Sequence, residues 1–263
     1  MRILFWNTHR NNINEYLQNL VQDYNIDILA VSEYTANGQE LDMMLKNSQQ
    51  YLVRCNTVGC ERIKIWANYV DIAAGNQHKY YTIQILKEEY ILCFVHLMSD
   101  LRGDYSEERF ELIQQIMYEL KKMEEKIHSK KTIIIGDMNE TPYGKGCLDA
   151  RAFHGLSALN ITDRATRKVT GTEYRKFYNP MWNLMGDFTY PPGTYYLNDS
   201  KLYSPMWQIL DQVIISKDVL PAFKKEELKI ITTCSYGGLM NSKGRPNKKI
   251  SDHFPIMCEI ETE

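Results

Sequence analysis

Acidic, amide and imidazole side chains stand at the ends of several apolar runs in this sequence. They are Asn7, Glu33, His96, Asp137, Asn139, Asp211, Asp252 and His253. Loops at strand ends are where rigid scaffolds hold catalytic groups. Any one of these residues, taken alone, has the ordinary interpretation of a capping or solvent-exposed side chain. If the runs are strands of two packed sheets, however, their ends converge on one rim and the polar groups form a single site.

The segment 133–142 is the sharpest of these features. Three isoleucines are followed by Gly136, Asp137, Met138 and Asn139, so polar side chains project directly from the end of a buried strand. Carboxylate and amide oxygens are hard ligands that suit Mg²⁺ or Mn²⁺. A histidine beside them can donate to a phosphate oxygen. The set therefore predicts metal-assisted hydrolysis of a phosphate ester, in which the metal neutralises charge and positions water.

The elements that must position these groups run through the whole chain as strands and helices. Apolar residues at helical spacing predict helices at 13–24, 38–47 and 107–128, with Asn12 and Ser106 as N-caps of the first and the third. Strands are expected at 2–6, 26–31, 51–55, 63–67, 80–86, 90–95, 132–135, 210–216 and 256–260. We therefore expect one α/β domain with two sheets over residues 1–263.

Composition excludes several classes of protein. Of the 263 residues, 44% are hydrophobic and 24% are charged, which is ordinary for a globular protein and excludes a mainly disordered chain or a collagen-like repeat. The 31 Lys and Arg against 33 Asp and Glu give a net charge of −2. This balance disfavours a globally basic nucleic-acid binder but says nothing about local basic patches.

The six cysteines predict neither a zinc site nor a disulfide framework. They form no C-x-x-C pair and show no Cys/His spacing that suits zinc. Several lie inside apolar runs, so we expect buried reduced thiols in a cytoplasmic protein. The apolar run 1–6 is too short for a signal peptide, and no run approaches the ~18 apolar residues of a membrane span.

Taken together and in chain order, these motifs resemble those of a known superfamily. They are Trp6-Asn7, Glu33, His96, Gly136-Asp137-Met138-Asn139, Asp211 and Ser251-Asp252-His253. They are similar to the motifs of the endonuclease/exonuclease/phosphatase superfamily, which includes pancreatic DNase, exonuclease III, abasic-site endonucleases, deadenylases, sphingomyelinases and inositol-polyphosphate 5-phosphatases. The resemblance implies a four-layer α/β sandwich, two packed and mostly antiparallel sheets flanked by helices, with the site on one rim.

The resemblance also implies a metal site for Mg²⁺ or Mn²⁺. By position, Glu33 matches the metal-binding glutamate of the family. Asn7 and Asp252 match the residues that complete the metal shell, directly or through water. Two positions depart from the family pattern: Ser32 stands where Gln is usual, and Gln212 stands where many members have His or Arg. We expect these departures to affect contacts around the ligands more than the metal itself.

The remaining site residues match family positions with roles in the chemistry. Asp137 matches the aspartate that orients or deprotonates the attacking water, and Asn139 the asparagine that holds the phosphate or the water. His253 matches the histidine that contacts the scissile phosphate, and Asp211 the carboxylate that orients it. His96 matches the position taken by histidine or tyrosine near the leaving group. Because all these residues are present, we expect an active enzyme.

The substrate class is indicated less sharply. The segment 207–212 lacks the Pro-x-Trp-Cys-Asp-Arg block of inositol 5-phosphatases, which argues against that branch. The segment 241–249 carries four basic residues and no acid and runs into Asp252-His253, while 164–176 is also basic. A polyanionic substrate gains most from several phosphate contacts. Lys243 and Arg245 are therefore candidate substrate contacts, although a solvated surface loop is the ordinary alternative.

An aromatic, loop-like region at 177–196 offers a second hint. Aromatic faces can stack unpaired bases, but a packed loop closing the core has the same composition. Within it, Thr194 and Tyr195 weakly resemble the Thr-aromatic motif of the family near the scissile group. The favoured function is a DNA or RNA nuclease. A phosphatase or phosphodiesterase of a small or lipid phosphate and a non-catalytic binding module are the alternatives, and endo or exo action and the oligomeric state stay open.

Overall fold

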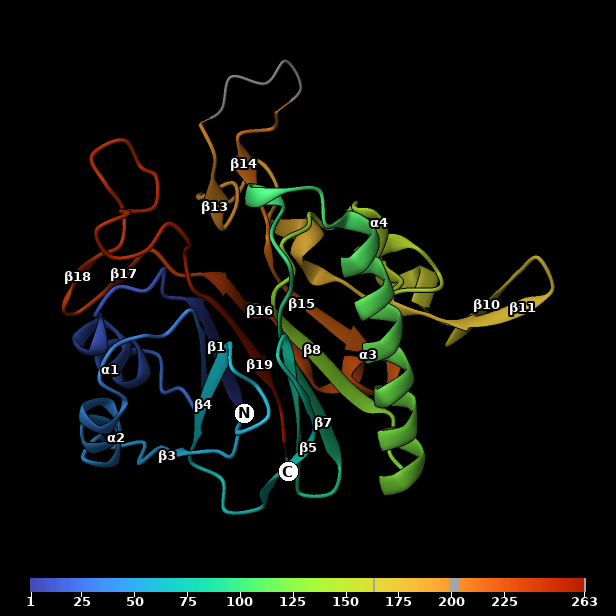
Figure 1. Cartoon of the computed structure of the whole chain (residues 1–263), viewed down its shortest axis with the longest axis horizontal. Coiled ribbons are helices and arrows are strands. Elements are labelled where there is room, and N and C mark those ends of the chain that lie inside the picture. Colours follow the sequence, from blue (N-terminus) through green and yellow to red (C-terminus); the bar gives the residue numbers. More distant parts are fainter. Residues whose placement is uncertain (163, 199–203, 263) are drawn as a thin grey trace.

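Two β-sheets pack face to face at the centre of the computed structural model, which describes residues 1–162, 164–198 and 204–262 (Figure 1). The core between them consists of apolar side chains from both sheets, such as Phe5 and Ala30 from one and Phe94, Ile135 and Val213 from the other. Helices cover both outer faces. The expected sandwich of two mostly antiparallel sheets flanked by helices is confirmed.

The first sheet has six strands in the order β16-β19-β1-β2-β4-β3. Their bounds are β16 Phe223–Ile230, β19 Ile256–Ile260, β1 Arg2–Asn7, β2 Ile28–Ser32, β4 Ile63–Ala67 and β3 Val53–Arg54. Only the β1–β2 pair is parallel. Because β1 and β2 are parallel neighbours, Asn7 and Ser32 lie side by side at the same end of the sheet.

The second sheet has seven strands in the order β5-β6-β7-β8-β15-β12-β9. Their bounds are β5 Ile72–His78, β6 Tyr81–Leu86, β7 Tyr90–His96, β8 Lys131–Asp137, β15 Asp211–Ser216, β12 Phe177–Tyr178 and β9 Gly155–Leu156. The central strands β7 and β8 are parallel, and β15 runs antiparallel to β8. These three strands read as continuous apolar runs because both of their faces are covered.

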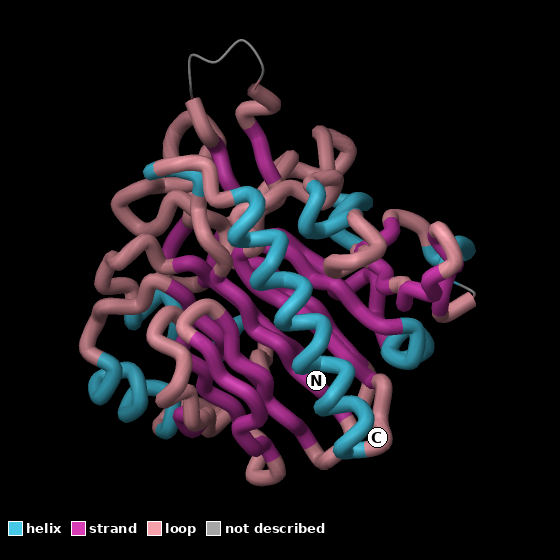
Figure 2. Tube along the Cα trace, turned by 45° about the vertical axis from the view of Figure 1, so that its right-hand side comes forward, coloured by secondary structure: helices cyan, strands magenta, loops and turns pink. Residues whose placement is uncertain are grey.

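The helices pack on the outer faces of the sheets through apolar stripes. Helices α1 (Asn14–Asp23) and α2 (Gly38–Lys46) cover the six-stranded sheet. Helix α3 (Ser106–Ile127) lies across the seven-stranded sheet, followed by the short α4 (Lys145–Leu148) (Figure 2). Four 3₁₀ turns occur at Asp100–Arg102, Leu159–Thr162, Pro180–Leu184 and Lys217–Ala222. None of the helices in the described ranges is long and apolar enough to cross a membrane.

Three two-stranded ribbons extend from the sandwich. They are β10 (Thr166–Val169) with β11 (Thr172–Arg175), β13 (Tyr195–Tyr196) with β14 (Trp207–Gln208), and β17 (Thr233–Cys234) with β18 (Gly237–Gly238). The β10–β11 hairpin projects at the right-hand end of the long axis. The strands β13 and β14 lie at the top of the view, and β17 and β18 lie at its upper left (Figure 1). The strands of these last two ribbons therefore lie along one edge of the sandwich.

The expected N-caps are wrong. Helix α1 starts at Asn14 with Ile13 in the cap position, and no side chain caps it. Helix α3 starts at Ser106 itself, and Asp104 Oδ1 accepts hydrogen bonds from the backbone N–H and the hydroxyl of Ser106. The acid two residues before the helix therefore takes the role expected of the serine.

Gly136 is where strand β8 passes closest to strand β7. A Cβ built on Gly136 would lie 2.0 Å from the carbonyl oxygen of Val95, and its φ of +151° disfavours other residues. We predict that Gly136→Ala lowers the free energy of unfolding by about 3 kcal/mol or more, in the upper range for one substitution, because backbone must move. Gly238→Ala, with nothing within 4 Å of its Cβ, is the matched control. Denaturant unfolding of both variants checks this, and equal losses would contradict it.

Candidate active site

Three neighbouring strands bring His96, Asp137 and Asp211 into one row. His96 is in register with Asp137 across β7 and β8, and Asp137 is in register with Asp211 across β8 and β15. Side chains alternate along a strand, so these three lie on the face that also carries the inter-sheet core. All three are buried, at 4%, 1% and 0% exposure. These three residues therefore form the polar edge of the inter-sheet core, at the rim of the sandwich.

The six-stranded sheet supplies groups that meet this row from the opposite side. Asn7, at the end of β1, donates from Nδ2 to Asp137 Oδ2 at 3.0 Å. His253, just before β19, places Nδ1 2.7 Å from Asp211 Oδ2. Both hydrogen bonds join one sheet to the other. The two sheets are therefore tied together through the polar residues themselves.

The Trp-Asn and Ser-Asp-His motifs hold each other in place. Trp6 Nε1 donates to the carbonyl oxygen of His253 at 2.8 Å. Ser251 Oγ donates to the carbonyl oxygen of Asn7 and accepts the backbone N–H of His253. The Tyr195 ring lies 4.8 Å from that of His253, measured between centroids. These contacts fix the position of the His253 imidazole. The Trp-Asn and Ser-Asp-His motifs therefore support each other.

The electrostatics separate the two histidines. Burial opposes a charge on His253, but Asp211, Asp137 and Asp252 together outweigh it and raise its pKa from 6.5 to about 10. Burial lowers the pKa of His96 to about 4, against the attraction of Asp137. At neutral pH His253 is therefore a cation that donates hydrogen bonds, and His96 is neutral.

Asp137 is a buried carboxylate with fixed orientation. Burial raises its pKa, and the charge of His253 opposes that rise. Its two oxygens accept from Asn7 Nδ2 and, at 2.9 Å, from the backbone N–H of Asn139. Asn139 has φ +48° and donates from Nδ2 to the carbonyl oxygen of Leu97 at 3.0 Å. A raised pKa with a fixed direction is what a general base needs.

A continuous set of polar contacts extends from this centre to the surface. His96 Nε2 lies 3.6 Å from Glu33 Oε1 and 3.7 Å from Asp137 Oδ2. On the other side, Asp252 Oδ1 lies 4.0 Å from His253 Nε2. The Glu33 and Asp252 side chains are 25% and 14% exposed, so their oxygens are open to solvent at the rim. The structure thus brings all eight strand-end residues of the sequence analysis into one neighbourhood.

Two site residues, His9 and Arg10, were not singled out from the sequence. His9 Nδ1 lies 3.0 Å from Asp252 Oδ1, and Arg10 Nε lies 3.4 Å from Glu33 Oε2. Their φ values of 50° and 60° turn the chain in the left-handed region directly after β1. Their position two and three residues after Asn7 is the feature of the sequence that could have indicated them. The turn that directs them toward Asp252 and Glu33 depends on the fold.

The donor set fits a hard divalent cation. Asn7 offers an amide oxygen, which accepts the backbone N–H of His9 at 3.0 Å and keeps a second lone pair. Asp211 Oδ1 is buried and has no hydrogen-bond partner within the described residues. Asp137, Asp211 and His253 offer ligand atoms within 4.8 Å of one another. Glu33, Asp252 and Asn7 offer oxygens at the rim, the atom type that Mg²⁺ and Mn²⁺ prefer.

Thr194 lies behind the site. It is fully buried, and its Oγ1 accepts the backbone N–H groups of Leu210 and Asp211 at 3.1 and 3.2 Å. Its carbonyl oxygen accepts the N–H of Phe254 at 2.8 Å. Thr194 therefore aligns the segments that carry Asp211 and His253, and Tyr195 follows it against the His253 ring.

The two departures from the family pattern have different surroundings. Gln212 donates from Nε2 to the carbonyl oxygen of Glu140 at 2.6 Å and accepts from Asn179 at 2.7 Å, so it anchors the loop after Asn139. Ser32 Oγ is buried, and within the described residues it has no hydrogen-bond partner. Gln212 thus supports the loop after Asn139, whereas the Ser32 hydroxyl supports none of the site residues within the described part of the chain.

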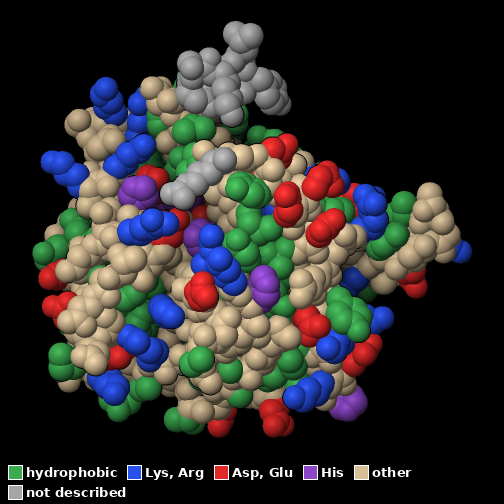
Figure 3. Space-filling model, viewed as in Figure 1, with side chains coloured by type: hydrophobic (Ala, Val, Ile, Leu, Met, Phe, Trp, Pro, Cys, Tyr) green, Lys and Arg blue, Asp and Glu red, His purple; other side chains and the backbone are tan. Residues whose placement is uncertain are grey.

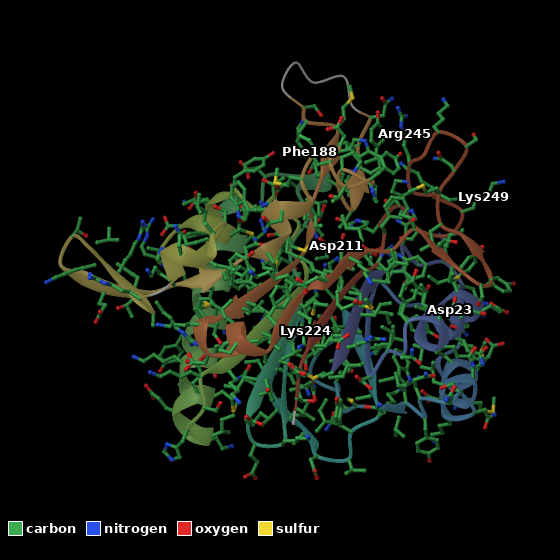
Figure 4. The ribbon with its side chains drawn as sticks, turned by 180° about the vertical axis from the view of Figure 1, so that it is seen from behind. Asp23, Phe188, Asp211, Lys224, Arg245 and Lys249 are labelled. Atoms are coloured by element: carbon green, nitrogen blue, oxygen red, sulfur yellow. The ribbon has the colours of Figure 1, made fainter. Side chains whose placement is uncertain are left out.

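The basic segment 241–249 lies beside the site. A cavity of about 200 Å³ is bounded by this segment, by the end of the β13 ribbon and by Asp252. Lys and Arg side chains gather over this part of the surface next to a histidine (Figure 3). Seen from behind, Arg245 lies on the loop at the upper right, and Asp211 lies nearer the centre of the molecule (Figure 4). Lys243 is exposed on the same loop.

The other basic segment, 164–176, forms the β10–β11 hairpin at the opposite end of the long axis (Figures 1 and 4). Arg175 pairs with Glu124 of α3 and donates to the carbonyl oxygen of Lys130. Part of its charge is therefore structural. Of the aromatic region 177–196, the first part packs into the core through Phe177, Tyr178 and Met181.

Solved structures share this architecture. No family model matches the sequence, and no curated protein matches it. The chain is similar to the 3′ phosphatase NExo from Neisseria bound to a product DNA hairpin, with 15% identity, a TM-score of 0.58 and coverage of 100% of both chains. The 3′–5′ exonuclease NExo from Neisseria meningitidis matches with the same values. The fold is exonuclease III-like. At this identity the likeness establishes the architecture alone.

The charge state of His253 is a testable consequence of this geometry. We predict that the His253 imidazole of the metal-free protein titrates near pH 10 and that Asp211→Asn lowers this pKa by removing the 2.7 Å partner. Because the folded pKa is raised above 6.5, the stabilisation is complete below about pH 6.5 and is lost as the pH rises through about 10. Imidazole NMR titration measures the shift. Asp218→Asn, at an exposed carboxylate, is the control, and an unchanged titration in Asp211→Asn would refute the assignment.

Proposed function

We propose that this protein is a divalent-metal-dependent phosphodiester hydrolase that acts on nucleic acid. One observation carries the proposal: a protonated His253, paired with Asp211, lies beside a carboxylate of raised pKa, Asp137. Both pKa values are raised, so His253 keeps a proton that it can donate, and Asp137 accepts a proton more readily than a free carboxylate does. The open oxygens of Glu33 and Asp252 at the same rim supply hard ligands next to that pair.

Glu33, Asp252 and Asn7 would hold the cation. When bound, Mg²⁺ or Mn²⁺ supplies charge neutralisation and a template for the phosphate. Arg10 and His9, which contact Glu33 and Asp252, are exposed and can shift toward an incoming phosphate. The proton transfers are then left to the buried residues of the site.

Asp137 takes the proton of the attacking water. Its burial favours the protonated form after the transfer, and the hydrogen bonds from Asn7 and Asn139 keep it aimed. His253 Nε2 donates to a non-bridging phosphate oxygen, whose charge grows as the bond to water forms. Asp211 keeps that imidazole protonated and oriented. The phosphorus–oxygen bond to the leaving group breaks in the same step, and the leaving oxygen takes a proton from solvent. His96, neutral and buried, stands between Glu33 and Asp137, at the position that the family resemblance places near the leaving group.

A nucleic-acid substrate is supported over a small phosphate by the basic surface next to Asp252. Arg245 and Lys248 line the cavity that Asp252 also bounds, and the segment 241–249 that carries them holds no acid. Counterion release from several phosphates favours a polymer on such a surface. The Neisseria neighbours, a 3′–5′ exonuclease and a 3′ phosphatase bound to DNA, act on this substrate class.

Metal dependence is the first prediction of this proposal. Excess chelator should abolish hydrolysis of single- and double-stranded DNA and RNA, and Mg²⁺ or Mn²⁺ should restore it. Glu33→Gln should raise the metal concentration needed for half-maximal rate, while Glu226→Gln, on the exposed face of β16, should not. Mn²⁺ binding by calorimetry gives a readout apart from activity. Full activity in chelator, or turnover of inositol phosphates alone, would overturn the proposal.

The base assignment yields a second prediction. Asp137→Asn keeps the size of the side chain and removes its charge, so we expect a rate loss of about 10²–10⁴, the usual contribution of a positioned base. Binding of the oligonucleotide should survive, because no substrate contact is removed. Single-turnover kinetics and an equilibrium binding titration separate the two effects. A near-normal rate in Asp137→Asn would assign water activation to another group.

A further inference from the structure

The cavity of about 200 Å³ beside Asp252 has the chemistry of a nucleotide site. Its lining combines one aromatic ring, two cations and two amides. The lining residues are Tyr196, Leu197, Asn198, Asn241, Arg245, Pro246, Lys248 and Asp252. We infer that this cavity binds one unpaired nucleotide of the substrate strand next to the scissile phosphate. The inference rests on the proposed function and names the form of nucleic acid that it acts on.

A planar surface is already assembled in this cavity. The guanidinium carbon of Arg245 lies 3.8 Å from the centre of the Tyr196 ring. Trp207 backs Tyr196, edge to face, with 5.2 Å between ring centroids. Aromatic rings and guanidinium planes are the groups on which unpaired bases stack. The pair therefore presents a stacking surface that a base paired in a duplex would not reach.

The basic loop that carries Arg245 is rigid. Asn241 Oδ1 accepts the backbone N–H groups of Lys243 and Arg245, at 2.8 and 3.3 Å. The Tyr190 hydroxyl donates to the carbonyl oxygen of Gly244 at 2.6 Å, which ties the loop to the segment leading into β13. Asn11 fastens its base by donating to the carbonyl oxygen of Ile250 at 3.0 Å. A site held in place before binding loses less entropy when a ligand arrives.

Size and position define what can occupy the cavity. The cavity, at about 200 Å³, is smaller than the clefts of about 300–1,000 Å³ that hold drug-sized ligands, which favours one base as its occupant. Asp252, one of its walls, also lies 4.0 Å from His253. A nucleotide bound here is therefore adjacent to the phosphate that His253 contacts. Lys248, which also lines the cavity, can meet a phosphate of the same strand.

The loop offers a matched control. Lys249 carries the same charge on the same loop, but it is exposed and does not line the cavity (Figure 4). Tyr196→Leu removes the ring, Tyr196→Phe keeps it, and Arg245→Lys keeps the charge without the plane. These variants separate stacking from simple charge attraction.

The experiment uses the full-length protein and oligonucleotides with either an unpaired or a blunt, paired end. Hydrolysis rates in Mg²⁺ give kcat and KM, and 2-aminopurine at the unpaired end reports stacking by fluorescence quenching, measured in the slow Asp137→Asn background. We expect lower KM for the unpaired end and quenching on binding. Tyr196→Leu should raise that KM about 5- to 150-fold with kcat unchanged, the usual value of one stacked base. Arg245→Lys should act in the same direction, whereas Tyr196→Phe and Lys249→Ser should act little.

The outcomes distinguish a failure of the nucleotide site from a failure of the proposed function. Hydrolysis of nucleic acid that is equal for both ends, with Tyr196→Leu unaffected, would overturn the nucleotide site and leave the proposed function intact. An Arg245→Lys variant equal to the wild type would also overturn the stacking surface. No hydrolysis of any nucleic acid, in either metal, would overturn the proposed function and the site together. DNA and RNA versions of both oligonucleotides show which sugar the cavity accepts.

Discussion

The hydrogen bond between His253 and Asp211 is the interaction on which the rest of the site depends. It links the two sheets at their rim and converts a buried negative charge into a neutral pair. An uncompensated carboxylate at this depth would be expensive, and removing one partner of a buried pair is strongly destabilising. With His253 positive, the second buried carboxylate, Asp137, can remain beside Asp211 in the same row. The protonation states that the chemistry needs are therefore also the states that stabilise the rim.

Much of this site could be predicted from the sequence because it is built from strand ends. The central strands β7, β8 and β15 are covered on both faces, so their apolar runs are long and the polar residue that ends each run is conspicuous. Sheet register then places His96, Asp137 and Asp211 together without any information from the loops. The outer strands gave no such signal. Strand β5 is half-exposed and β16 is rich in lysine and glutamate, as edge strands can be.

Features set by long-range packing could not be predicted in the same way. His9 and Arg10 reach Asp252 and Glu33 only because the chain turns through two left-handed residues, which no local pattern of His-Arg demands. The N-caps were misassigned because Asn12 and Ser106 are good capping types in the wrong register. Thr194, predicted as a substrate contact, is fully buried, and its Oγ1 accepts the backbone N–H groups of Leu210 and Asp211. In each case the sequence shows what the side chain can do chemically, whereas the groups that it contacts depend on the surrounding fold.

The two basic segments show why placement decides what charge can do. They have similar composition, yet the hairpin at 164–176 lies at the far end of the molecule. Its Arg175 forms an ion pair with Glu124 of α3. The segment 241–249 instead continues without interruption into Asp252 and His253. Its hydrogen bonds to Tyr190 and Asn11 hold it against the rim. Under the proposed function, substrate contacts and catalytic groups share this one stretch of chain, so a strand bound along the loop would reach the His253 imidazole with little further freedom to lose.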